Sequence, residues 1–243
     1  MALTLRGNGQ LSADNYGIDS DGSITATGIT STGNAGIGTS SPTNYANYST
    51  LTLNDTNGGV LEFKKGNTQV SRISNANDQA LQFVTNGSER MRVDASGRVT
   101  TPYQPAFLAH GNNANYFSVT ALGNGSYIPF TNVQLNIGNC YNSSTKRFTA
   151  PVAGTYQFNV SAYTRTGTAT EDIYTRWRVN GSVNIGYTYF YNTTGTEIHH
   201  TITDSITIFL NVGDDMGVIV LGNANADLYT GYQECRFSGY LIG

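Results

Sequence analysis

Apolar and polar residues alternate with a period of two along most of this chain. After a turn at Pro151, the residues Tyr156, Phe158 and Val160 alternate with polar neighbours, which indicates a strand with one apolar face. The closing residues 237–243 alternate in the same way, which puts Phe237 and Leu241 on one face of a terminal strand and Tyr240 and Ile242 on the other. No stretch shows sustained helical periodicity, so the pattern predicts an all-β protein.

The composition supports this fold class and limits the kinds of binding partner that we expect. Charged residues make up 12% of the chain, and its 28 glycines suit short strands joined by tight turns better than helices. Proteins that bind nucleic acid usually carry a basic surface, and the net charge of −3 gives no support for such binding. No apolar run is long enough for a membrane-spanning helix, so we expect no membrane insertion. The first ten residues lack the pattern of a signal peptide, so we expect synthesis and assembly in a cytoplasm.

Three segments carry a family resemblance. They are FTAPVAGTYQFNV at residues 148–160, LNVGDDMGVIV at residues 210–220 and FSGYLIG at residues 237–243. In this order and spacing they resemble the C1q/tumour-necrosis-factor-like family. The resemblance covers residues 104–243 and implies a jelly-roll sandwich that assembles as a homotrimer.

The first hundred residues contain short alternating pieces and too few large apolar residues for a core of their own. Residues 18–25 and 93–100 share an Asp–Gly turn pattern that predicts a hairpin, and residues 34–50 are linker-like. Ordering costs about 1.5 kcal/mol per residue, whereas a buried large apolar side chain returns about 1.5–3 kcal/mol. The segment therefore predicts an obligate oligomer that shares a narrow core.

Two phrases in this region resemble the shafts of bacteriophage tail fibres. They are GIGTSSP at residues 36–42 and SERMRVDASGRV at residues 88–99. Together the two resemblances imply three parts, which are an attachment segment at residues 1–33, a trimeric β-rich shaft at residues 34–103 and a C1q-like jelly-roll knob at residues 104–243.

The sequence offers no enzyme motif. It contains no Gly-x-Ser-x-Gly elbow, phosphate loop or His-Glu-x-x-His pattern. We therefore expect a protein that is not an enzyme, with no catalytic residues and no cofactor.

The candidate metal ligands have simpler explanations. His199 and His200 are adjacent, so on a strand they point to opposite faces and cannot bind one ion without a bend. A single histidine repeated around a threefold axis stays an alternative. Asp19 and the pair Asp214–Asp215 are typical of turns, although some C1q-like relatives bind calcium near the trimer axis. We predict no metal site from these residues.

The two cysteines, Cys140 and Cys235, do not form a disulfide scaffold. Cys235 falls on the same strand face as Phe237 and Leu241, which favours a buried free thiol. The alternative is a disulfide between Cys140 and Cys235.

The strongest binding candidate is the segment 186–195. Tyr187, Tyr189 and Tyr191 share one strand face and are followed by a polar loop that starts at Asn192. Tyrosines stack on sugars and donate hydrogen bonds, so these four residues are the predicted receptor-binding site for a host cell-surface glycan. The alternative is that the tyrosines pack in the sandwich core or between copies in the trimer.

These observations predict a phage structural fibre located in the virion. Residues 1–33 would bind other tail, baseplate or capsid proteins, and the knob would bind the host receptor. One alternative is a capsid or baseplate decoration protein that binds no receptor. Another is a secreted bacterial C1q-like adhesin.

Overall fold

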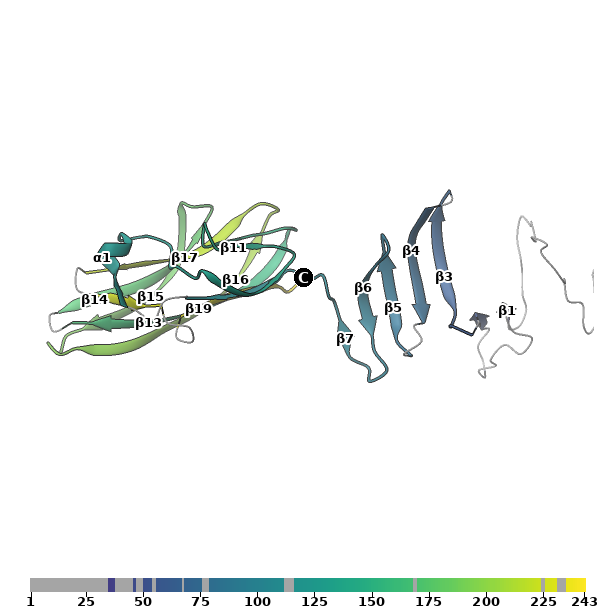
Figure 1. Ribbon diagram of the computed structural model, residues 1–243, viewed down its shortest axis with the longest axis horizontal. Helices are drawn as coiled ribbons and strands as arrows, with labels where there is room; N and C mark the ends of the chain where they lie inside the picture. The colour runs from purple at the N-terminus through teal and green to yellow at the C-terminus, as the bar shows by residue number, and fades with distance from the viewer. Residues whose placement is uncertain are drawn as a thin grey trace, which may run out of the picture. The chain divides into compact units, whose positions relative to one another are not determined.

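The structure is a computed structural model that describes residues 35–37, 46, 50–53, 56–66, 68–75, 79–111, 116–167, 170–223, 226–230 and 235–243. These residues are almost entirely β (Figure 1), which confirms the predicted fold class. The chain divides into two compact units, residues 1–60 and residues 61–243. The predicted attachment segment at residues 1–33, with its hairpin at residues 18–25, lies outside the described residues. Within the described part, no helix is both long and apolar enough to cross a membrane.

The first unit contains one described pair of strands. Strand β1 (Ala35–Ile37) pairs in parallel with β2 (Leu51–Leu53). The linker-like stretch predicted at residues 34–50 was therefore wrong at β1. Ala35 pairs with Leu51 and Ile37 pairs with Leu53, so this short apolar segment forms a strand within the stretch expected to be a linker.

The second unit begins with a five-stranded sheet in which the strands follow one another in chain order. They are β3 (Val60–Lys65), β4 (Thr68–Asn75), β5 (Leu81–Thr85), β6 (Ser88–Val93) and β7 (Val99–Thr100). The predicted turn at residues 93–100 joins β6 to β7. Its Asp94 carboxylate accepts hydrogen bonds from the backbone N–H groups of Ser96 and Arg98, each 2.9 Å long, and Gly97 takes a φ of 80°.

This sheet has one mainly apolar face, while its opposite face carries charged residues around the buried Val84. The pairing registers place these apolar residues on a common face: Ile73, Leu81, Phe83, Met91, Val93 and Val99. On the opposite face Glu89 accepts hydrogen bonds from Gln82 (2.6 Å) and Arg92 (3.0 Å). Among the described strands the sheet is a single layer, so apolar side chains such as Leu81 and Val99 stay exposed.

The rest of the second unit is a sandwich of two sheets (Figure 1). The seven-stranded sheet contains β8 (Ala106–His110), β9 (Tyr116–Ser118), β10 (Asn132–Ile137), β13 (Gly154–Thr166), β16 (Ile198–Leu210), β18 (Asp227–Tyr229) and β19 (Arg236–Leu241). The five-stranded sheet contains β11 (Tyr141–Asn142), β12 (Arg147–Thr149), β14 (Glu171–Val179), β15 (Val183–Asn192) and β17 (Asp215–Gly222), and a short helix α1 (Val119–Leu122) precedes β10.

Strand β13 organises the seven-stranded sheet. It pairs along its whole length with β16 on one side, and with β19 and β18 on the other. The sheet order is β10-β8-β19-β13-β18-β9, and among the described strands none pairs with the outer edge of β16. In the other sheet the order is β11-β12-β17-β14-β15, which leaves β15 as an edge strand.

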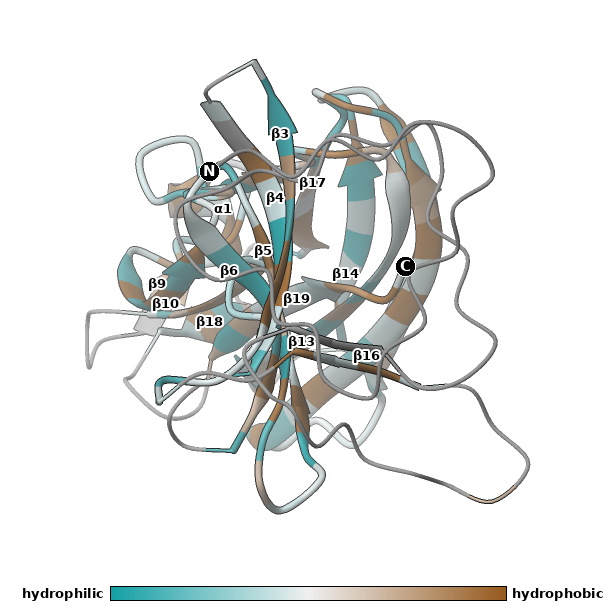
Figure 2. Ribbon diagram, turned by 90° about the vertical axis from the view of Figure 1, so that its right-hand side faces the viewer, coloured by the Kyte–Doolittle hydropathy of each residue, from teal (hydrophilic) through white to brown (hydrophobic). Residues whose placement is uncertain are grey.

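The core lies between the two sheets and is rich in aromatic rings. Alternate side chains of β13 and β14 point into it, and Figure 2 shows hydrophobic and hydrophilic residues in alternating bands along the strands. Phe158 and Phe237 from the seven-stranded sheet are fully buried, and Trp177 enters from the other sheet. The predicted faces of the closing strand are confirmed, because Phe237 faces the core and Tyr240 faces out.

Both cysteines are buried in this domain and neither forms a disulfide, which confirms the free-thiol interpretation. The Cys140 thiol donates to the carbonyl of Ile137 at 3.3 Å, and the Cys235 thiol donates to the carbonyl of Tyr229 at 2.6 Å. Burial raises the pKa of Cys140 to about 11, so this thiol stays protonated and unreactive at neutral pH.

Candidate functional site

The three tyrosines predicted to bind a receptor lie on the edge strand β15 and face away from the core. Their exposed fractions are 65% for Tyr187, 50% for Tyr189 and 48% for Tyr191. The structure therefore does not place them in the sandwich core, which was one of the two alternatives. A surface for a ligand and an interface between copies are both compatible with this position.

A β-bulge explains why the tyrosines face outward. Ile185 pairs with Trp177 and packs against the core, so uninterrupted alternation would turn Tyr187 inward as well. The register shifts at this point, and Gly186 and Tyr187 together lie opposite Arg176. Gly186 takes a φ of 62°, which glycine adopts without strain. The extra residue moves all three tyrosines to the outer face.

The neighbouring strand β14 adds three side chains to the same face. Tyr174 lies directly opposite Tyr189, and Asp172 lies opposite Tyr191 (Figure 1 shows β14 beside β15). Arg176 lies beside the bulge. We name this set the tyrosine ladder, and its six members are Asp172, Tyr174, Arg176, Tyr187, Tyr189 and Tyr191.

The rings of the tyrosine ladder contact one another in a continuous row. Tyr189 and Tyr191 stack with centroids 6.1 Å apart and an interplanar angle of 12°. The Tyr174 ring lies 6.5 Å from the Tyr187 ring and 6.1 Å from the Tyr189 ring. Tyr174 is tilted by 70° to the Tyr187 ring and by 51° to the Tyr189 ring. The result is a row of aromatic rings whose hydroxyl groups can donate and accept hydrogen bonds.

Charged groups stand at the two ends of the β14 side of the ladder. The guanidinium carbon of Arg176 lies 5.2 Å from the centroid of Tyr174 and 5.7 Å from that of Tyr187, within cation–π range. Burial against its neighbours, and then the Asp172 carboxylate, raise the pKa of Tyr189, so this phenol stays a hydrogen-bond donor at neutral pH.

Asn192, the fourth predicted site residue, is buried and holds the following loop. Its amide nitrogen donates to the Thr166 hydroxyl (3.0 Å) and to the carbonyls of Gly167 (3.1 Å) and Thr196 (2.7 Å). Its amide oxygen accepts from the backbone N–H of Thr194 at 3.0 Å. We expected this side chain to be open to a ligand, but these bonds occupy it, because it ties the loop to the end of β13.

Sequence reasoning missed Asp172, Tyr174 and Arg176. They alternate along β14, which signals a shared face, but only the pairing register of β14 with β15 brings that face to the tyrosines.

The two histidines point to opposite faces of β16, as predicted. His199 Nδ1 lies 3.0 Å from the Tyr163 hydroxyl, and its Nε2 lies 3.0 Å from the Glu197 carboxylate. The His200 ring instead stacks on Phe190, with centroids 4.2 Å apart. Within the described residues, no group of three or more His, Cys, Asp or Glu side chains is arranged to hold a metal ion.

The pair Asp214–Asp215 is engaged in the turn before β17. Asp214 accepts hydrogen bonds from the Asn180 side chain and from the backbone N–H of Asn211, both 2.8 Å long. These bonds, that of Asn180 first, lower the pKa of Asp214. Asp215 forms an ion pair with Arg147 at 2.8 Å. These contacts support the turn interpretation of the two residues.

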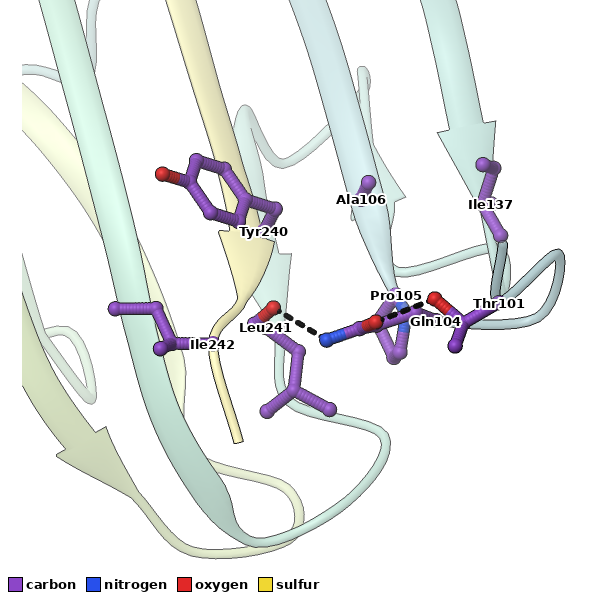
Figure 3. A pocket seen from close by; sticks show the side chains of 8 residues that line it. All are labelled: Thr101, Gln104, Pro105, Ala106, Ile137, Tyr240, Leu241 and Ile242. Atoms are coloured by element: carbon purple, nitrogen blue, oxygen red, sulfur yellow. Dashed lines mark hydrogen bonds between the residues drawn. The ribbon is translucent and has the colours of Figure 1, made fainter. Parts of the chain in front are cut away.

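A shallow hollow of about 450 Å³ lies where the chain enters and leaves the sandwich (Figure 3). Gln104 spans it, because its amide nitrogen donates to the Leu241 carbonyl at 2.7 Å and its oxygen accepts from Thr101 at 2.6 Å. Tyr240 and Ile242 line the hollow and are about half exposed. The hollow is therefore lined mainly by apolar side chains and lies on the outer face of the seven-stranded sheet.

Comparisons with known proteins concern the sandwich part of the chain. Residues 106–242 match the C1q domain. The globular domain of zebrafish complement 1qA is 16% identical, with 58% of this chain and 98% of that chain covered and a TM-score of 0.43. Eiger TNF from S. frugiperda is 13% identical, with 58% and 93% covered and a TM-score of 0.41. No curated protein matches the chain.

Proposed function

Because this chain belongs to the C1q domain family, we propose that it is a non-enzymatic trimeric fibre protein whose C-terminal knob binds a cell-surface glycan. C1q domains commonly form trimers, and they are typically binding or structural domains. The observation that carries the binding role is the exposed tyrosine row on β15, which neither the core nor a neighbouring strand covers.

Two uncovered apolar surfaces support the trimer. One is the apolar face of the sheet β3–β7, on which Leu81 is 44% and Val99 is 59% exposed. The other lies on the seven-stranded sheet, where Phe209 is 61% exposed and Tyr240 and Ile242 are about half exposed. Several exposed apolar side chains on one face favour an interface. Three copies around one axis would bury both surfaces.

The virion assignment rests on the resemblance of residues 36–42 and 88–99 to phage tail-fibre shafts. In this proposal residues 1–33 attach the fibre to other virion proteins, residues 34–103 form the shaft, and residues 104–243 form the knob. The protein assembles in the host cytoplasm and functions in the virion.

The binding mechanism is stacking combined with multivalency. Sugar rings lie on the exposed faces of Tyr187, Tyr189 and Tyr191, and the tyrosine hydroxyls bond to sugar hydroxyls. Asn192 contributes by fixing the adjacent loop. Three knobs on one fibre then convert weak single contacts into tight adhesion, because later contacts form at high effective concentration.

Replacing Tyr187, Tyr189 or Tyr191 singly by serine should weaken adsorption to host cells and leave the fold intact. These side chains are half or more exposed, so we expect the free energy of unfolding to change by about 0.5 kcal/mol or less. Loss of one stacking ring should lower single-site affinity about two- to tenfold. Labelling of cells by the fluorescent full-length protein, together with its melting temperature, measures both effects.

Tyr103→Ser is the matched control, since Tyr103 is 56% exposed but lies outside the tyrosine ladder. It should leave labelling unchanged. If the full-length protein labels no cell to which the parent virus adsorbs, the receptor-binding proposal fails and a decoration protein takes its place. If all three serine variants unfold, the row is structural.

A further inference from the structure

We propose that the tyrosine ladder selects an acidic polysaccharide and that Arg176 binds a sugar carboxylate. This inference rests on the proposed function and names the ligand class of the same site. It depends on the position of one arginine among the aromatic rings and on the charge at the opposite end of the ladder.

Arg176 differs from Arg147 and Arg178 in having no polar partner among the described residues. Arg147 forms an ion pair with Asp215, and Arg178 donates to the Asn184 side chain (2.9 Å) and to the Gly125 carbonyl (3.2 Å). No hydrogen bond or ion pair to another described residue engages the guanidinium of Arg176, and its Nε is buried without a partner. The two tyrosine rings hold the group in place but leave its donors unused.

A sugar carboxylate matches these unused donors. A guanidinium presents N–H groups in a planar fork that fits the two oxygens of one carboxylate. Phosphate recognition usually gathers several cationic side chains, whereas the tyrosine ladder contains only Arg176. An apolar partner would bury this charge without compensation, which is unfavourable. The ladder therefore favours a carboxylated sugar next to Tyr174 and Tyr187.

The far end of the ladder sets the orientation of the ligand. Asp172 lies four residues before Arg176 on the same strand face, a separation of about 13 Å at the usual rise per residue. Its Oδ1 is buried and has no hydrogen-bond partner among the described residues, so the Oδ2 atom is the one that a ligand would meet. A carboxylate repels an acidic group and accepts hydrogen bonds from neutral hydroxyls. A chain of sugars would thus place its acidic unit at Arg176 and an uncharged unit at Asp172, with the tyrosine rings between.

The test uses the full-length protein and polysaccharide extracted from a cell that the protein labels. The polysaccharide is immobilised either untreated or after carbodiimide-mediated reduction of its carboxylates to alcohols, and binding is measured by biolayer interferometry. We expect about tenfold or greater weakening on the reduced polysaccharide, the size typical of a lost charge-assisted hydrogen bond. High salt should shrink this difference.

Variants assign the difference to Arg176. Arg176→Gln should bind both surfaces equally weakly, and Arg176→Lys should keep part of the preference because it keeps the charge. Arg178→Gln is the matched control on the same strand face. It also removes one positive charge, but the Arg178 guanidinium already donates to Asn184 and Gly125. It should keep the full preference, provided that its melting temperature shows a folded protein.

The outcomes separate this inference from the proposed function. Equal binding to both surfaces, a preference that survives Arg176→Gln, or an extract that does not bind would overturn the acidic-ligand inference while cell labelling still supports a receptor-binding knob. If no cell is labelled at all, the proposed function itself fails.

Discussion

Replacing Phe237 by alanine is expected to lower the free energy of unfolding of the knob by about 3–5 kcal/mol per chain. The side chain is fully buried. Its ring centroid lies 4.8 Å from that of Phe107, 5.7 Å from Phe130 and 5.9 Å from Tyr141. Removing it deletes apolar contacts and leaves a cavity that these rigid rings cannot fill. Chemical denaturation followed by intrinsic fluorescence measures the loss.

Tyr187→Ala is the control for this substitution, because it also removes an aromatic ring but one that is 65% exposed. It should change stability far less. An unchanged denaturation midpoint for Phe237→Ala would mean that β19 does not close the core as described here.

The knob is expected to fold without the shaft, whereas the isolated shaft segment is expected to remain unfolded or to aggregate as a single chain. A fragment of residues 104–243 contains both sheets of the sandwich and the whole aromatic core. A fragment of residues 1–103 contains the sheet β3–β7, whose apolar face is covered by no second sheet among the described strands. Burial in that layer cannot offset the entropy of ordering the chain.

Two-dimensional NMR of each fragment distinguishes these results. The knob fragment should give dispersed amide resonances and a cooperative thermal transition. Dispersed resonances from a monomeric fragment of residues 1–103 would show that the shaft has a sufficient core of its own, and the proposed division of the chain would be wrong.

The alternation of apolar and polar residues was sufficient to predict the fold class and to assign residues to the two faces of individual strands. Alternation assigned Phe237 and Tyr240 to opposite faces of the closing strand, and it assigned His199 and His200 to opposite faces of theirs. These predictions hold because a strand has only two faces and neighbouring residues must occupy both.

The position of the tyrosine row could not be predicted from alternation. A period of two shows that Tyr187, Tyr189 and Tyr191 share a face, but it does not show which face is buried. The answer depends on the bulge at Gly186, which reverses the phase set by Ile185. A glycine inside an alternating strand is a signal for such a bulge.

Contacts between segments that are distant in the chain could not be predicted from the sequence either. Arg176 joins the tyrosines only through the register of β14 with β15. Asn192 was predicted from its place next to the tyrosines, yet its side chain points to Thr166 and Gly167 at the end of β13. These two partners are distant in sequence, so the local sequence did not indicate that they engage Asn192.

The oligomeric mass of the full-length protein tests the central claim, a trimeric fibre, most directly. Sedimentation velocity at micromolar concentration should show one elongated species with the mass of three chains of 26.1 kDa each. The apolar face of β3–β7 and the exposed Phe209 would then be covered by neighbouring copies. A stable, folded monomer of 26.1 kDa under these conditions would contradict the account.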